Sequence, residues 1–455
     1  MSIQSPSLIP NPDEVSLTSV LADKDPYLTE LLNQCQLNLI DPEVAWVQEI
    51  RDRASVAVRQ YSLPTTRDEE YRFVDLSSLR QIAFQAATEK VELLSDSALI
   101  PEAANSRLVF VNGVYAPQLS AVANLPDGVV VSTLAGLPMM YLSRVREYLA
   151  QVQGAEEVFT ALNTAGLTDV AVVWVPKNLV VETPIHLLFV SAPGELPTIS
   201  QVRCLVVAES GSSVTLIEEY TNRQDKDAKE EEEKVYFTNA VTEIWVEENA
   251  QVSHTRVERE GNAAFHIGKS AITQARDSRY TCNAITLGAK LSRHNLDVFQ
   301  MGEQTETILN CLTMIGDRQL ADTHSAIAFN YPHGMSRQLH KCIVADRAHA
   351  VFNGKVFVSK PAQLTDAGQL NRNLLLSPKA RVDTKPQLEI IADDVKCTHG
   401  ATVSQLDDEE VFYLQSRGLD ETNARNLLIN AFAAEIINRL PVASLREMLS
   451  TEVRR

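Results

Sequence analysis

A cysteine and a histidine stand two residues apart in the stretch DDVKCTHGAT, which begins at Asp393. In a β-strand alternate side chains share a face, so Cys397 and His399 point the same way, and Asp393 has the same parity. Thiolate and imidazole together bind soft or borderline metals such as iron or zinc. Two ligands do not complete a site, so further ligands would come from elsewhere or from another chain. A buried cysteine beside a hydrogen-bonded histidine is the alternative interpretation.

The other motifs give no support for catalysis. GNAAFHIGKS, from Gly261 to Ser270, resembles a phosphate-binding loop, but six residues instead of four separate its first glycine from GKS, and its flanks favour a strand. The sequence contains neither the GxSxG pattern of serine hydrolases nor the HExxH pattern of zinc hydrolases. These motifs therefore identify no catalytic residue. If ATP matters to its function, another subunit hydrolyses it.

The composition narrows the range of partners. The chain has 455 residues, of which 59 are acidic and 41 basic, and its formal net charge is −18. This balance disfavours binding to nucleic acid or to anionic membranes. Six cysteines without a CxxC pair encode neither a disulfide framework nor a zinc module, which favours a reducing compartment. No basic leader precedes an apolar run and no apolar stretch reaches membrane-spanning length, so we expect a cytoplasmic protein.

The pattern along the chain predicts three segments. Residues 1–165 show apolar residues at helical spacing with some short strands and form a helix-rich N-terminal domain. Residues 166–404 consist of short β-branched runs separated by Pro, Gly, Asn and Asp, and form the β core. Residues 405–455 return to helical spacing. The charge run from Asp225 to Lys234 is interpreted as a solvated loop.

A repeat of about 31 residues is visible within the β core. Apolar residues that open its short runs alternate in spacing between 12 and 19, which is typical of a coil with two strand-bearing faces. On this spacing Cys311 and Cys342 would be neighbours across adjacent coils, with Asn373 next in the column. Stacked small side chains and a metal pair are the two interpretations of that column. The opening residues are Ile308, Leu320, Leu339, Val351, Leu370 and Val382.

The helix ETNARNLLINAFAAEIINRL has more apolar surface than one contact needs. A helix on one surface requires an apolar arc of about 100 degrees, whereas this helix keeps only a narrow polar strip. Burial in a helical hairpin with PVASLREMLSTEV explains the excess, and so does the docking of another protein; both can hold. One of its two apolar stripes consists of Ala424, Leu428, Phe432 and Ile436.

Two longer stretches resemble a known family. PQLEIIADDVKCTHGATVSQLDDEEVFYLQSRGL resembles the C-terminal core signature of the SufB/SufD family, the scaffold proteins of the SUF iron–sulfur cluster assembly machine, and VPKNLVVETPIHLLFV resembles the opening of that family's core. SufB-like chains carry a functional cysteine in the turn before this block and a Glu on each side of the matching histidine. This sequence has Asn371, Thr398 and Gly400 at those positions, so it is most similar to SufD.

The resemblance implies a fold, a scaffold role without enzymatic activity or catalytic residues, and a set of partners. It implies a mainly β protein with a right-handed parallel β-helix core, flanked by α-helical N- and C-terminal domains. It also implies a complex with a SufB-like paralogue and SufC-like ATPases, in which the C-terminal helices dock the ATPase through Leu428, Phe432 and Ile436. Cys397 and His399 would lie at the interface with the paralogue and hold iron or an iron–sulfur cluster transiently, with no permanently bound cofactor.

Two other interpretations stay open at this point. Parallel β-helix enzymes that act on acidic polysaccharides align carboxylates and basic residues along an outer groove, although such enzymes are usually exported. A self-sufficient homodimer could use the same edge that would meet the paralogue.

Overall fold

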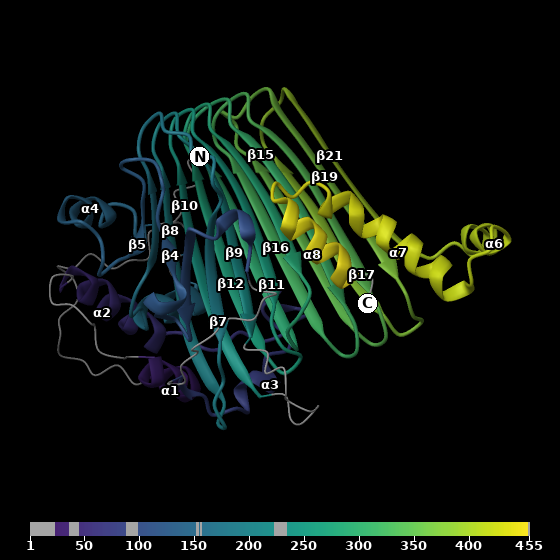
Figure 1. The fold of residues 1–455 in the computed structure, drawn as a ribbon, viewed down its shortest axis with the longest axis horizontal. Helices are drawn as coiled ribbons and strands as arrows, with labels where there is room; N and C mark the ends of the chain where they lie inside the picture. The colour runs from purple at the N-terminus through teal and green to yellow at the C-terminus, as the bar shows by residue number, and fades with distance from the viewer. Residues whose placement is uncertain are drawn as a thin grey trace.

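The computed structural model describes residues 23–35, 45–87, 99–151, 154, 157–222 and 234–453. Within these ranges, parallel strands alternate between two long sheets, so that the chain winds as a solenoid (Figure 1). Helices lie at both ends of the described chain. The prediction of a mainly β protein with a parallel β-helix core between helical N- and C-terminal regions is confirmed.

Each coil places one strand in each sheet. Along the first sheet, here sheet A, the coil strands are β6 (Ala171–Val175), β8 (Thr198–Ala208), β10 (Tyr236–Val246), β12 (Phe265–Gln274), β14 (Leu291–Gln300), β16 (Leu320–Phe329), β18 (His349–Val358) and β20 (Arg381–Ile390). Along the second, sheet B, they are β7 (Ile185–Ser191), β9 (Ser213–Asn222), β11 (Gln251–Arg259), β13 (Arg279–Thr286), β15 (Glu306–Ile315), β17 (Met335–Val344), β19 (Thr365–Leu375) and β21 (Val395–Gln405).

The coil length varies, which corrects the constant repeat expected from the sequence. Leu291, Leu320, His349 and Arg381 are successive register partners in sheet A, and the last of these steps is three residues longer than each of the other two. The predicted pair Leu339 and Leu370 is in register. By contrast, Ile308 pairs with Arg337, because the preceding coil is two residues shorter. The two-faced coil is therefore confirmed and its fixed period is wrong.

One edge of the solenoid is held by a column of left-handed residues. Asn249, Asp277, Gln304, His333 and Leu364 each have φ between +57° and +61°. The backbone amide of each donates a hydrogen bond of 2.6 to 3.2 Å to a carbonyl of the following coil. This conformation reverses the chain sharply and is unfavourable for side chains other than Gly, Asn and Asp. The repeated bond from coil to coil compensates for that cost.

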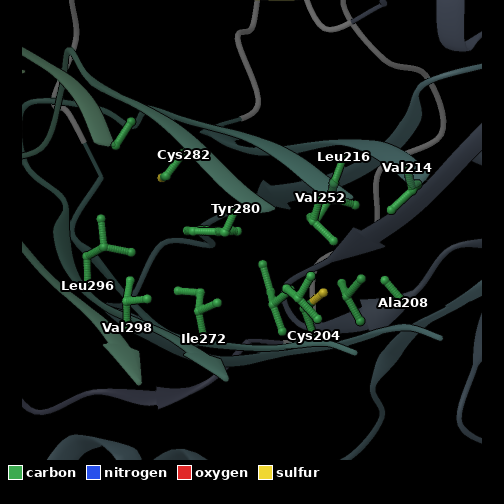
Figure 2. Packing of buried hydrophobic residues seen from close by; sticks show 14 of the residues in the cluster. Cys204, Ala208, Val214, Leu216, Val252, Ile272, Tyr280, Cys282, Leu296 and Val298 are labelled. Carbon is green, nitrogen blue, oxygen red and sulfur yellow. The ribbon is translucent and has the colours of Figure 1, made fainter. Parts of the chain in front are cut away.

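Apolar side chains fill the space between the sheets in the middle coils. Figure 2 shows Ile272, Leu296 and Val298 of sheet A facing Leu216 and Tyr280 of sheet B. All five are buried. Because alternate residues of a strand share a face, every second side chain enters this interior. The solenoid core is thus built as a sandwich of two parallel sheets.

The N-terminal region is joined to the solenoid. β1 (Gln85–Ala86) pairs with β8, β2 (Ser106–Val111) pairs in parallel with β7, and β5 (Val130–Thr133) pairs with β6. Strands on both sides of the predicted boundary at residue 165 therefore belong to the same two sheets. The remaining elements of this region are β3 (Val114–Tyr115), β4 (Ala121–Val122), α1 (Pro26–Cys35), α2 (Ala45–Arg59), α3 (Ser77–Arg80), α4 (Met139–Val145), α5 (Val158–Ala165) and the short 3-10 turns Glu69–Tyr71, Pro101–Ala103 and Pro117–Leu119.

Three helices follow β21: α6 (Asp408–Ser416), α7 (Glu421–Ile437) and α8 (Ala443–Val453). Gly418 follows the C-terminal end of α6, and its φ of +97° is the left-handed conformation that commonly terminates a helix. The Asp420 carboxylate caps α7 by accepting a hydrogen bond from the Asn423 backbone amide at 2.8 Å. α6 and the start of α7 extend away from the solenoid, whereas α8 and the end of α7 lie on it (Figure 1).

Two predictions made from composition can be placed here. Among the helices of the described ranges, none combines the length and the apolar character that crossing a membrane requires. The charge run from Asp225 to Lys234 lies outside the described residues except for Lys234.

Candidate functional site at the open end of the solenoid

The solenoid ends in two strands that are paired on one side only. Among the described residues, β20 is hydrogen-bonded to β18 and β21 to β19, and each stands last in its sheet. Most residues of β21 are exposed, and those of β20 are mostly half-buried. An unpaired strand edge is a template for pairing with another chain. We call this end of the molecule, formed by β20 and β21, the open end.

Cys397 and His399 both lie on β21. Cys397 is half-buried and packs against the apolar interior, and His399 is exposed. Because the two residues have the same parity, both side chains belong to the interior-facing side of the strand. Asp393 lies in a bend before the strand, so its predicted place on the same face is wrong. The described residues contain no group of three or more His, Cys, Asp or Glu side chains that could hold a metal ion.

The donor set on β21 is therefore incomplete. One thiol and one imidazole are suitable ligands for iron, but a tetrahedral site or a cluster takes four. Burial raises the pKa of the Cys397 thiol, so it is protonated until a nearby cation or metal stabilises the thiolate. Within the part of the chain that the structure describes, Cys397 and His399 therefore lack the further ligands that a complete site would need.

Polar side chains occupy part of the interior of the last coils, beside apolar ones such as Val356 and Ala367, and sequence reasoning missed the buried glutamines among them. Gln338, Gln369 and His399 are successive register partners on β17, β19 and β21, and the two glutamines are buried. His340 and Asn371 form a neighbouring buried pair. Burial lowers the pKa of His340 to about 3, so its imidazole is neutral. The spacing between Gln338 and Gln369 equals the repeat expected from the sequence, and it was the one sequence signal that could have found them.

The register also corrects the cysteine column. Cys311 pairs with His340 and not with Cys342, although the predicted neighbours Cys342 and Asn373 are in register. Burial raises the pKa of Cys342 to about 12, so its thiol is not a ready metal ligand. Asn371 lies within β19 and not in a turn, which corrects the place expected for the cysteine that it replaces.

A groove lies between α6 and α7, beyond the open end. Its apolar lining includes Tyr413, Leu414, Leu427 and Leu428, and its acidic rim is formed by Asp407, Glu409 and Glu410. Tyr413 and Leu427 are about half exposed, at 56% and 48%. Of the three residues predicted to dock a partner, only Leu428 lines this groove.

The other two residues hold α7 to the solenoid. Ile436 is 0% exposed in a cluster with residues of sheet B, so its assignment as a docking residue is wrong. Phe432 is half-buried, and the Lys341 ammonium lies 3.9 Å from its ring centre. Lys341 also donates to the Phe432 carbonyl at 2.8 Å and to Glu435 at 2.6 Å. The excess apolar surface of this helix is thus divided between burial near its end and exposure near its start.

Several buried charged groups of the middle coils are paired, as two examples show. The His254 imidazole lies 3.0 Å from a Glu218 oxygen. Burial opposes charge on both groups, but their hydrogen bond and mutual attraction lower the pKa of Glu218 to about 2, and a hydrogen bond with Cys282 together with the Glu218 contact raises the pKa of His254 to about 9. In β12, the Lys269 ammonium binds Glu157 and Asp297 at 2.7 and 2.8 Å. The GKS stretch is therefore strand with a paired lysine, as expected, and not a phosphate loop.

The comparison with family models decides the relationship. Residues 189–432 match the SufBD core domain of SUF system FeS cluster assembly, and residues 23–187 match the SufBD N-terminal region. The chain belongs to the SufB/SufD family. It is 48% identical over 402 residues to an iron–sulfur cluster assembly SufBD family protein of Synechocystis sp., with 88% of each chain covered.

Two further relatives place the chain within the SufB/SufD family. It is 33% identical over 393 residues to the iron–sulfur cluster assembly protein SufD of Escherichia coli, covering 86% of this chain and 88% of that one. It is 34% identical over 449 residues to the chloroplastic protein ABCI7 of Arabidopsis thaliana, covering 97% and 93%. The chain is thus a SufD-like iron–sulfur cluster assembly protein, as the block around Cys397 and His399 indicated.

Proposed function

We propose that this SufD-like chain is a non-catalytic scaffold subunit of a SUF complex. It pairs with a SufB-like paralogue through the open end and docks a SufC-like ATPase on the groove between α6 and α7. The observation that carries the proposal is the position of Cys397 and His399 on β21, a long strand with one edge that no strand of the described ranges pairs with. A paralogue of the same fold would cover this edge and supply the missing ligands.

The two strands of the open end differ in how well they can pair. β20 contains Pro386, which has no backbone N–H, and the charged side chains of Arg381, Asp383, Lys385 and Glu389. Such residues protect a sheet edge against pairing. β21 has no proline, and Lys396 is its only Lys, Arg, Asp or Glu. β21 is therefore the strand that would continue into the partner's sheet.

Iron or a nascent cluster is cargo in this proposal. The neutral imidazole of His399 coordinates it, and the Cys397 thiol loses its proton as the metal approaches. Movement of the docked ATPases would shift the interface and control access to these two side chains. Lys341, Glu435 and Phe432 connect α7 to β17, so a force on the groove is transmitted to the last coils.

The assignment of ATP hydrolysis to another subunit has its own support. Lys269 is buried and its ammonium is bound by two carboxylates, so it cannot approach a phosphate. The groove is suited to a partner that presents apolar side chains beside basic ones, because acidic residues rim its apolar lining.

Replacement of His399 by Ala tests the metal role. We expect iron–sulfur cluster assembly in cells to fall strongly while the complex with the paralogue and the ATPase is still recovered. Thr398→Ala, on the opposite face of the same strand, is the matched control and should assemble normally. Undiminished assembly with an intact His399→Ala complex would remove His399 from the mechanism.

Charge substitution in the groove tests the docking role. Leu427→Asp should abolish co-purification of the SufC-like ATPase while pairing with the paralogue persists. Met139→Asp, at an exposed apolar position on α4, is the control. ATPase retained by Leu427→Asp would exclude the groove. Sedimentation of the chain alone tests the third interpretation: a homodimer abolished by changes in β21 would show that the open end also pairs with itself.

A further inference from the structure

Gln369 is a buried amide directly beside the exposed His399. It lies on β19 at the position in register with His399 on β21, and its side chain is 3% exposed. Ala367 and Cys397, two residues earlier on each strand, both pack against the interior, so Gln369 and His399 belong to the same face of sheet B. In-register residues on neighbouring strands are about 4.8 Å apart, which is within reach of a glutamine side chain.

The orientation of this amide is fixed by a chain of hydrogen bonds. Gln369 Nε2 donates to Gln338 Oε1 at 2.9 Å, and Gln338 Nε2 donates to Ser325 Oγ at 2.7 Å. Gln369 Nε2 therefore already donates a hydrogen bond to the preceding coil. The oxygen of the same amide, Oε1, is buried and has no hydrogen-bond partner among the residues that the structure describes. Buried acceptors are almost always paired in native proteins, so this one is suited to a donor that arrives later.

The opposite sheet is shaped around the same amide. Gly354 of β18 faces Gln369, and a Cβ atom built on it would lie 2.2 Å from Gln369 Nε2. A side chain at this position would displace the amide. The glycine thus preserves the place and direction of the Gln369 carboxamide within the last coils.

We propose that Gln369 is a positioning residue for His399. When a partner covers β21, Gln369 Oε1 accepts a hydrogen bond from one ring N–H of His399, and the other ring nitrogen is presented to the metal. This inference rests on the proposed metal role of His399. In the chain alone His399 is exposed, so water competes for its N–H; covering the strand removes that competition.

The bond would have a defined chemical effect. A histidine that donates one N–H to a fixed acceptor is held in one tautomer and one ring orientation. Removal of such an outer partner typically weakens metal binding about 10- to 100-fold. A residue that only fills the interior would affect folding or complex recovery, but not the affinity of the assembled site.

The test uses the co-expressed complex of this chain with its SufB-like paralogue and SufC-like ATPase, titrated anaerobically with Co²⁺. Absorption reports both affinity and thiolate ligation by Cys397. Gln369→Leu should weaken Co²⁺ binding about 10- to 100-fold. Gln369→Glu keeps an acceptor beside His399 and should retain binding within about threefold or tighten it, because a carboxylate makes the imidazole a better ligand. Gln274→Leu, at another buried glutamine that lies on β12, is the matched control.

The outcomes separate the two proposals. Wild-type affinity in Gln369→Leu, together with loss of the site in His399→Ala, would overturn the role of Gln369 and leave that of His399. Wild-type affinity in His399→Ala would overturn the proposed metal role itself. If Gln369→Leu yields no complex, Gln369→Glu decides, since a loss of affinity above about 10-fold in that variant contradicts the inference.

Discussion

The two ends of the solenoid are built in opposite ways. At the N-terminal end, β2 and β5 continue the sheets and the interior side chains are apolar, as with Leu187 and Phe189. At the C-terminal end, no described strand pairs with the outer edges of β20 and β21, and the buried interior beneath them contains Gln369 and Asn371. Both ends are reached by the same repeating coil.

This difference indicates which end of the solenoid is complete in the chain alone. Apolar burial stabilises a fold in the chain alone, whereas a buried polar atom without a partner costs free energy until something pairs with it. Among the described residues, buried atoms without a hydrogen-bond partner occur along the whole solenoid, including His186 Nδ1 on β7, and those that face the interior near the open end include Gln369 Oε1, Asn373 Oδ1 and His340 Nδ1. We interpret the N-terminal end as closed for stability and the open end as prepared for assembly.

A matched pair of leucines should show this contrast most strongly. Leu187 is fully buried in β7, and Leu388 is half-buried in β20. Leu187→Ala should lower the free energy of unfolding by about 3 kcal/mol and Leu388→Ala by about 1 kcal/mol, because the half-buried site loses less burial and leaves no closed cavity. Urea unfolding of both variants measures the difference. Equal costs at the two positions would break the comparison.

Charge on each outer strand of sheet B tests which end assembles. Val403 on β21 is 51% exposed, and Val114 on β3, at the other end of the sheet, is 41% exposed. Val403→Lys should weaken association with the SufB-like paralogue at least about 100-fold, since an unpaired ammonium is costly to bury. Val114→Lys should leave association unchanged. Calorimetric titration distinguishes them, and the reverse ranking would refute the assignment of the open end.

Two glycines sharpen the account of the polar interior. A Cβ on Gly354 would lie 2.2 Å from Gln369 Nε2 and 2.6 Å from Phe352 Cζ, whereas a Cβ on Gly368 would meet nothing closer than 3.5 Å. Gly354→Ala should therefore lower the free energy of unfolding by about 1–3 kcal/mol, which is typical of overpacking. Gly368→Ala is expected to be near neutral. Similar stabilities of the two variants in urea would show that the interior has room to adjust.

Low pH should lower the stability of the fold through His340, which lies in the polar interior. Burial holds the pKa of His340 at about 3, below its ordinary value of 6.5. Between these two values His340 binds a proton in the unfolded chain but not in the folded chain. The stability that this neutral histidine contributes is present above about pH 6.5 and is lost as the pH falls toward 3, at up to about 1.4 kcal/mol per pH unit. Urea unfolding between about pH 7 and pH 5 should show that the free energy of unfolding depends less on pH in His340→Gln than in the unchanged protein. The same pH dependence in both proteins would contradict a buried, neutral His340.

The general fold could be predicted from the sequence because alternation and repetition are local signals. The register could not, since the turns between strands change length: the step from His349 to Arg381 is three residues longer than the step from Leu320 to His349. A shift of two residues keeps a side chain on its face but changes its neighbour. Cys311 was therefore expected beside Cys342 and lies beside His340.

The candidate site could be predicted only in part for a related reason. Strand alternation identified Cys397 and His399, because both lie on one uninterrupted strand. Gln369 escaped notice because a glutamine in a strand is ordinarily interpreted as exposed, and only the observed register shows that it is buried beside His399. Ile436 was misassigned because α7 is apolar around most of its circumference, and only packing shows which side meets the solenoid.

The most direct test of the open end is amide hydrogen exchange of β21. The rate is measured for the peptide that contains Val395–Gln405, with and without the SufB-like paralogue. Pairing of this edge predicts that exchange slows strongly on addition of the paralogue, while exchange of β3 at the opposite end of the sheet does not change. Unaltered exchange in β21 within a complex that has demonstrably formed would contradict the account.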